Sequence, residues 1–205
     1  MNKAQNIYDN QVFFDGYKSA EFKALGATTV LDVDISEKML AVATAEHPDI
    51  EFVRADMSDL SFLKHKYDVV FSSLALHYIE DFGKFVKDVY SLLNDGGYFI
   101  FSQEHPLTTA PIAGASWSRD PEGNVLHYNL TDYARGGKRS TRWIVDGVEK
   151  YHRTFSEIIN ALVAEGFSIE KMLEPIPVQE TIERDKSWEK DQHKPNFLLI
   201  KAMKR

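Results

Sequence analysis

Residues 21–40 read EFKALGATTVLDVDISEKML, and this stretch decides the fold. EFKALGA is typical of a helix end, TTVLDVD of a β-strand, and SEKML of a second helix that begins after Ser36. In a nucleotide-binding α/β protein, an acid that closes a strand before a helix, here Asp34, holds a ribose. Such an acid follows a glycine-rich loop by about 20 residues. Upstream of Asp34 there are only Gly16 and Gly26, and no two glycines of the chain stand two apart.

The composition of the chain limits its class. With 205 residues and 43% hydrophobic content, the chain is long enough for one domain, 1–205, with a sizeable core. A net charge of -7 argues against a nucleic-acid partner, because phosphate contacts require clustered Lys and Arg. The absence of cysteine excludes disulfides and thiolate metal sites and suits a reducing cytoplasm. No stretch approaches the ~20 apolar residues that span a bilayer, so we expect a cytoplasmic protein without a membrane partner. Its oligomeric state is left open.

Short apolar runs alternate with helical patterns from residue 28 to residue 103. The expected strands after the first are IEFVRAD, YDVVFSSL and YFIFS, and the expected helices cover residues 36–48 and 81–94. YDVVFSSL is almost continuously apolar, which is typical of a parallel strand covered on both faces. This alternation predicts a doubly wound α/β fold, with a mostly parallel sheet and helices on both of its faces.

The pattern changes after residue 103. Turn residues indicate a loop and hairpin insertion over 103–153, with a turn at Asp146–Gly147. A further helix begins at a capping box formed by Thr154 and Glu157 and ends at Gly166. FSIEKML and NFLLIKAM then predict two last strands that are antiparallel neighbours.

Five segments occur in the order found in class I S-adenosylmethionine (SAM)-dependent methyltransferases. They are VDISEKML, FVRADMSDL, YDVVFSSLALHYIED, LLNDGGYFIFSQEHP and YHRTFSEIINALVAEGF. Over roughly residues 25–175 the chain thus resembles the small-molecule branch of this family. The resemblance implies a Rossmann-like sheet of seven strands whose last strand is antiparallel, SAM as the cofactor, and a small-molecule methyl acceptor. YDNQVFFDGY also looks like the lid segment of related enzymes, here within 1–20.

The resemblance assigns cofactor contacts residue by residue. Asp34, with Ile35 beside it, would bind both ribose hydroxyls, because a carboxylate accepts one bond on each oxygen. Asp56 would accept from the adenine amine, and Met57 would pack against the ring. Three residues leave the central strand where the methyl group should lie: Ser72, Ser73 and Leu74. The alternatives are that Asp34 bonds only the local backbone at a helix start, and that DMSD is an ordinary polar turn.

Methyl transfer is an in-line displacement from a sulfonium, so the protein mainly supplies orientation and a dry cavity. His77 and His105 are the candidate bases, since both follow strand ends, although a lone histidine is more often structural. The candidate substrate contacts are Tyr8, Phe14 and Tyr17 in the lid segment, and Tyr151 and Arg153 in the insertion. The lid aromatics would close over the sulfonium by cation–π attraction, unless they simply pack in the core.

The most specific family motif, acid-x-G-x-G at the end of the first strand, is absent. EFKALGA resembles the end of the helix that follows this loop, so about one βα unit, on the order of 30–40 residues, is missing and the sheet is one strand short. In a second alignment, LGATTVLDV is the first strand with Asp32 as its acid, and the gap falls between Val33 and Asp34. Either alignment predicts weakened SAM binding.

The sequence therefore predicts a SAM-dependent methyltransferase for small molecules, with a non-catalytic methyltransferase-like binding or assembly protein as the alternative. A nicotinamide oxidoreductase would need G-x-G-x-x-G, which is absent. A serine hydrolase is disfavoured because GASWS ends in serine where the nucleophile elbow needs glycine. The chain also lacks H-E-x-x-H, so no metal site is expected.

Overall fold

The computed structural model describes residues 19–141 and 147–205. The chain divides into two compact units, one of Met1–Phe62 with Arg142–Val148 and one of Leu63–Thr141 with Glu149–Arg205. Each unit has a β-sheet of its own.

The first unit contains the predicted order of helix, strand, acid and helix. Its elements are α1 (Ser19–Ala24), β1 (Leu31–Asp34), α2 (Glu37–Glu46) and β2 (Glu51–Arg54). β1 and β2 pair in parallel, with Asp34 opposite Arg54. Ser36 caps α2 by accepting a hydrogen bond from the Met39 amide at 3.2 Å. A parallel pair joined by a helix is the βαβ unit expected from the sequence.

The second unit is built on a four-stranded mixed sheet. Its strands are, in spatial order, β3 (Tyr67–Ser73), β4 (Leu93–Glu104), β10 (Phe197–Lys204) and β9 (Phe167–Leu173). β3 and β4 are parallel, whereas β10 is antiparallel to both β4 and β9. The prediction of an antiparallel last strand is confirmed.

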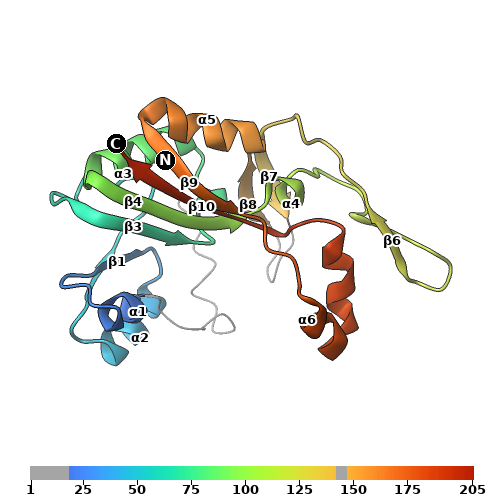
Figure 1. Ribbon diagram of the computed structural model, residues 1–205, viewed down its shortest axis with the longest axis horizontal. Helices are drawn as coiled ribbons and strands as arrows, with labels where there is room; N and C mark the ends of the chain where they lie inside the picture. Colours follow the sequence, from blue (N-terminus) through green and yellow to red (C-terminus); the bar gives the residue numbers. More distant parts are fainter. Residues whose placement is uncertain (1–18, 142–146) are drawn as a thin grey trace. The chain divides into compact units, whose positions relative to one another are not determined.

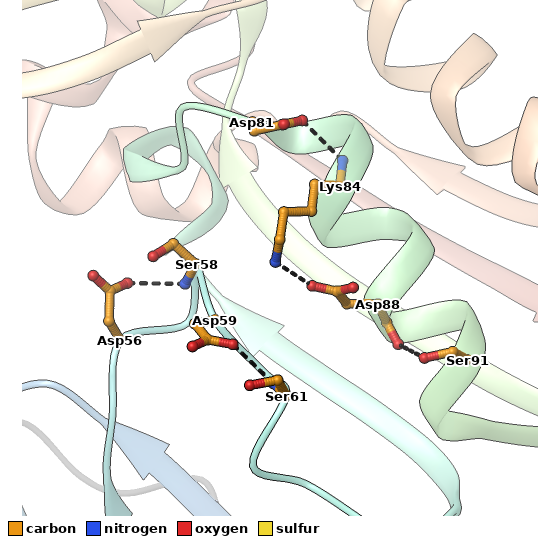
Figure 2. A network of polar contacts seen from close by, with 8 residues as sticks. All are labelled: Asp56, Ser58, Asp59, Ser61, Asp81, Lys84, Asp88 and Ser91. Carbon is orange, nitrogen blue, oxygen red and sulfur yellow. Dashed lines mark hydrogen bonds and ion pairs between the residues drawn. The ribbon is translucent and has the colours of Figure 1, made fainter. Parts of the chain in front are cut away.

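Helices α3 (Phe82–Leu92) and α5 (Phe155–Glu165) pack on this sheet and on one another (Figure 1). Rings of α3 meet rings of β4, with 6.1 Å between the Phe85 and Phe99 centroids. Asp81 caps α3, and Lys84 pairs with Asp88 one turn later at 2.6 Å (Figure 2). The predicted capping box of α5 is present, and Gly166, with φ of 109°, ends the helix in the left-handed region that glycine adopts without strain.

Two local predictions are wrong. The helix expected to reach residue 94 ends at Leu92, and the NDGG segment belongs to the irregular start of β4, because strand pairing with β3 begins at Leu93. β3 was expected to be covered on both faces, yet Val69 and Phe71 are each 40% exposed. Among the described strands β3 pairs only with β4, so it lies at an edge of its sheet.

The remaining elements are short. They are η2 (Leu76–Tyr78), α4 (Pro106–Thr109), β5 (Trp117–Arg119), β6 (Val125–Tyr128), β7 (Gly137–Thr141), β8 (Val148–His152), α6 (Gln179–Arg184) and η3 (Lys186–Gln192). β5 pairs with β6 and β7 pairs with β8. The predicted turn at Asp146 lies outside the described residues. Within the described ranges, no helix has both the length and the apolar character needed to cross a membrane.

Candidate functional site

Two carboxylates follow the parallel strands of the first unit. Asp34 is the last residue of β1, and its Oδ1 accepts a hydrogen bond from the Ser36 amide at 2.7 Å. Asp56 comes two residues after β2, is exposed, and accepts from the Ser58 amide at 2.8 Å (Figure 2). Because the carboxyl ends of parallel strands meet at one edge of a sheet, both acids lie at the same edge. Acceptor oxygens at this edge suit the hydroxyl and amine donors of a nucleoside.

The neighbours of these acids have defined local roles. The Ile35 carbonyl accepts from Arg54 Nε at 3.3 Å, while Arg54 also pairs with Glu37 at 2.8 Å. Met57 is half-buried beside Asp56. Asp32, the acid of the second alignment, accepts a short hydrogen bond from the Ser19 hydroxyl, and burial raises the pKa of its carboxyl. Asp34 and Asp56 therefore differ from Asp32 in lying at the strand end.

In the second unit, β3 ends in a strained turn at the predicted methyl-proximal residues. Leu74 has φ of 51°, a left-handed conformation that costs a non-glycine residue on the order of 1–3 kcal/mol. Its amide is held by Ser102 of β4, whose carbonyl lies 2.9 Å away. The Ser73 and Ser102 hydroxyls are 3.4 Å apart, and Ser72 is half-buried in the strand. Strain of this kind gathers at ligand-binding sites.

His77 lies on η2 directly after this turn and is 4% exposed. Its Nδ1 accepts a hydrogen bond from the Glu104 amide at 3.4 Å, which assigns the proton of the neutral ring to Nε2. Burial, together with the Lys150 and Arg153 cations, lowers the pKa of His77 to about 3. A group with so low a pKa is a weak general base near neutral pH.

His105, the second predicted base, caps α4. Its Nδ1 accepts from the Leu107 amide at 3.1 Å, and its Nε2 lies 2.8 Å from Glu174 Oε1. Burial lowers the pKa of His105, although Glu174 acts in the opposite direction. Both ring nitrogens are thus engaged, and a base role would require one of these bonds to open.

The predicted substrate residues of the second unit have structural contacts of their own. The Arg153 guanidinium donates to the carbonyls of Ile79 and Glu80, the latter at 2.8 Å, and stacks 5.2 Å from the Phe82 ring centroid. Burial lowers the pKa of Arg153 to about 10. Burial raises the pKa of the Tyr151 phenol, and the nearby Glu80 carboxylate raises it further. Three more predicted residues lie outside the described residues: Tyr8, Phe14 and Tyr17.

A small pocket brings three of the predicted residues together, namely His77, Tyr151 and Arg153. The full lining is His77, Gln103, Glu104, Pro106, Thr109, Tyr151, Arg153 and Ile158, all in the second unit. The pocket encloses about 10 Å³, the space of about one water molecule. His105 is not among the lining residues.

Sequence reasoning missed Gln103 and Glu104 of this pocket. Glu104, the last residue of β4, forms an ion pair with Lys150 of β8 at 2.5 Å, and the two side chains are 19% and 8% exposed. Gln103 is 4% exposed. One signal was available: Gln103 stands two residues after Phe101 and four after Phe99, on a face of the strand that is otherwise apolar. Across the described ranges, no cluster of three or more His, Asp or Glu residues could hold a metal ion.

Comparisons with known proteins identify the family of the chain. Residues 15–101 match the family described as a methyltransferase domain. A solved S-adenosylmethionine-dependent methyltransferase from Mesorhizobium loti is 38% identical, with a TM-score of 0.80 over 90% of this chain and 84% of that chain. The chain belongs to the class I SAM-dependent methyltransferases. An uncharacterised protein of Haemophilus influenzae is 34% identical over 87% of this chain and 73% of its own length.

Membership of this family sets the cofactor, which is SAM. Within the methyltransferase family, the phthiotriol/phenolphthiotriol dimycocerosates methyltransferase 1 of Mycobacterium ulcerans is 24% identical over 140 residues. This match covers 67% of the chain but only 48% of the length of that enzyme. The expected α/β fold and the expected cofactor are confirmed, and the acceptor is a separate question.

Proposed function

We propose that this methyltransferase acts on a small-molecule acceptor, by in-line transfer of a methyl group. The observation that carries the proposal is the pair of acids Asp34 and Asp56 at the carboxyl ends of neighbouring parallel strands, in a chain of this family. Bound SAM supplies the methyl group on a sulfonium, which is already an excellent leaving group. The protein has to bind SAM and the acceptor, orient them for the displacement, and exclude water from the site.

In this proposal the first unit holds the nucleoside. Asp34, with Ile35, binds the ribose hydroxyls, and the Asp34–Ser36 hydrogen bond fixes the carboxylate for that purpose. Asp56 accepts from the adenine amine, and half-buried Met57 offers its thioether to the ring. Three residues at the strained end of β3 serve the methionine and methyl end: Ser72, Ser73 and Leu74.

The second candidate is a non-catalytic protein that keeps the fold for binding or assembly. It is favoured by the lack of acid-x-G-x-G, because the backbone of that loop would approach the methionine part of SAM. It is also favoured by the two histidines, since His77 has a very low pKa and both nitrogens of His105 are engaged. We rank it second because methyl transfer to a reactive nucleophile needs no protein base.

We also propose one domain over 1–205, with the lid over 1–20 and the insertion over 103–153, and a cytoplasmic setting. The cytoplasmic proposal is supported by the absence of cysteine from the chain. An acidic net charge of -7 supports an acceptor other than nucleic acid.

Calorimetry with SAM and with its demethylated product, S-adenosylhomocysteine, tests the function. We expect binding weaker than micromolar, because the glycine loop is absent. Asp34→Asn should weaken binding of the product at least ~10-fold, since a hydrogen bond to a charged carboxylate contributes about 1.5–3 kcal/mol.

Asp59→Asn is the matched control. Asp59 accepts a hydrogen bond from the Ser61 amide at 3.0 Å (Figure 2). Asp34 and Asp56 likewise each accept from the amide of the residue two positions later. A loss caused only by a weakened turn would therefore occur in Asp59→Asn as well. Equal affinities for the two variants would contradict the ribose assignment, and no binding by the wild type would favour the second candidate. Micromolar affinity would instead show that the loop is dispensable.

A further inference from the structure

Gln103 is a buried polar side chain without a hydrogen-bond partner in the part of the chain that the structure describes. Its side chain follows Phe99 and Phe101 on the covered face of β4 and is 4% exposed. The carboxamide carries two N–H donors and an acceptor oxygen, and it lines the pocket beside His77. Native proteins rarely leave such a group unsatisfied, because burial removes its bonds to water. Gln103 therefore indicates a hydrogen-bond partner from outside the protein chain, either a water molecule or a ligand group of that size.

His77 supplies a second unsatisfied group to the same pocket. Its Nδ1 is occupied by the Glu104 amide, so its Nε2 carries the proton. Among the described residues, Nε2–H has no acceptor. The two other fully buried histidines differ: His152 bonds Thr109 Oγ1 at 2.8 Å and the Tyr133 carbonyl at 2.9 Å, and both nitrogens of His105 are bonded. The open donor is specific to His77 and to this pocket.

The charged groups around the pocket already have hydrogen-bond or ion-pair partners in the protein. Glu104 is paired with Lys150, and Arg153 donates to backbone carbonyls. Besides these groups, a ligand group in the pocket meets one ring N–H, one amide NH₂ and one amide oxygen. The enclosed volume of about 10 Å³ limits that group to about the size of a water molecule.

We propose that this pocket is the subsite for a hydroxyl group of the methyl acceptor. A hydroxyl has one O–H donor and two lone pairs. The donor serves Gln103 Oε1, and the lone pairs accept from Gln103 Nε2–H and His77 Nε2–H. A carboxylate brings no proton for Gln103 Oε1, and an ammonium brings no lone pair for His77 Nε2–H. The inference names the acceptor as a molecule that carries a hydroxyl group beside the nucleophile that is methylated, and it rests on the proposed function.

Gln103→Leu tests whether the carboxamide is kept for a ligand. The change removes an unsatisfied buried amide and leaves a side chain of similar size on an apolar face, so the midpoint of urea unfolding should rise above that of the wild type. The matched control is Gln179→Leu, because Gln179 is exposed and bonds Glu183 at 3.0 Å. Its midpoint should stay level or fall. A lower midpoint for Gln103→Leu would show a structural role and overturn the proposal.

Binding of matched probes tests the ligand class. Phenol is compared with toluene, and cyclohexanol with methylcyclohexane. Within each pair, a methyl group replaces the hydroxyl group. We would titrate each into the full chain and follow the ¹⁵N resonances of His77 and the Gln103 side-chain amide. Each hydroxyl probe should bind about tenfold tighter than its methyl partner, and benzoate should bind more weakly than phenol. In Gln103→Leu the preference should fall severalfold, because only the His77 Nε2–H bond to the hydroxyl remains.

Three results would overturn the proposal: equal affinity within each pair, no shift of either resonance, or an unchanged preference in Gln103→Leu. These outcomes are separate from those for the cofactor. A hydroxyl preference without SAM binding would leave the subsite in place and contradict the methyltransferase function. SAM binding without a hydroxyl preference would leave the methyltransferase function in place and contradict the subsite.

Discussion

On the covered face of β4, the residues in the middle of the strand and those at its carboxyl end differ in how their side chains are satisfied. Phe99 and Phe101 are 0% and 1% exposed, and their rings meet one another and the rings of α3. Gln103, two residues further on, is equally buried but has no hydrogen-bond partner among the described residues. The same backbone thus carries a satisfied core and then an unsatisfied pocket. A departure from the core pattern at a strand end is where function is expected.

The largest expected effect is on the core end. Phe101→Ala should lower the free energy of unfolding by about 3–5 kcal/mol, because it removes a fully buried ring that contacts Phe82 and Phe99. Urea unfolding measures the change. Gln103→Leu is expected to raise stability to urea, whereas Phe101→Ala is expected to lower it. A loss of stability of the same size at both positions would contradict the comparison.

The second effect concerns the ion pair between Lys150 and Glu104, of which Glu104 lines the pocket. Lys150→Met should lower the free energy of unfolding by about 3 kcal/mol, because Glu104 is left charged and largely buried. The double variant Lys150→Met with Glu104→Leu should recover most of this loss, since it removes both charges. Urea unfolding of the two single variants and the double variant forms a cycle. Additive losses would mean that the pair is not coupled.

The α/β order was predictable because it depends on local patterns. β-Branched runs, the Ser36 cap, the Thr154–Glu157 box and Gly166 each act within a few residues of chain. The end of α3 was mispredicted because the pairing of Leu93 with Tyr67 of β3, a contact distant in sequence, draws NDGG into a strand. The exposure of Phe71 likewise depends on which strands pair, which residues 67–73 alone do not specify.

The candidate site was predictable only in part, for a similar reason. Asp34 and Asp56 were found because an acid at a strand end is a local signal. Whether a polar side chain is satisfied depends on contacts far along the chain. His77 and His105 look alike in sequence, yet Glu174 engages His105, whereas His77 Nε2–H has no acceptor within residues 19–141 and 147–205. Gln103 was missed because the interruption of an apolar face acquires meaning only once burial is known.

The smallest of the three effects is the dependence of the free energy of unfolding on pH that His77 causes. The folded pKa of His77, about 3, lies below the ordinary value of 6.5, so the unfolded chain binds more protons between these values. Stability is therefore full above pH 6.5 and is lost as the pH falls toward 3. Between pH 7 and pH 5 the loss from His77 should be about 2 kcal/mol, at 1.36 kcal/mol per pH unit.

Burial also lowers the pKa of His105 and His152, so the wild type loses stability to acid from these residues as well. His77→Gln isolates the share of His77, because glutamine keeps a polar side chain and does not titrate. Urea unfolding at pH 7 and pH 5 should show a loss about 2 kcal/mol smaller in the variant than in the wild type. Parallel losses in the two proteins would mean that His77 is protonated in the folded state at pH 5. An imidazolium carries a proton on both nitrogens, so Nδ1 would then no longer accept from Glu104, and the geometry of the hydroxyl subsite would be wrong.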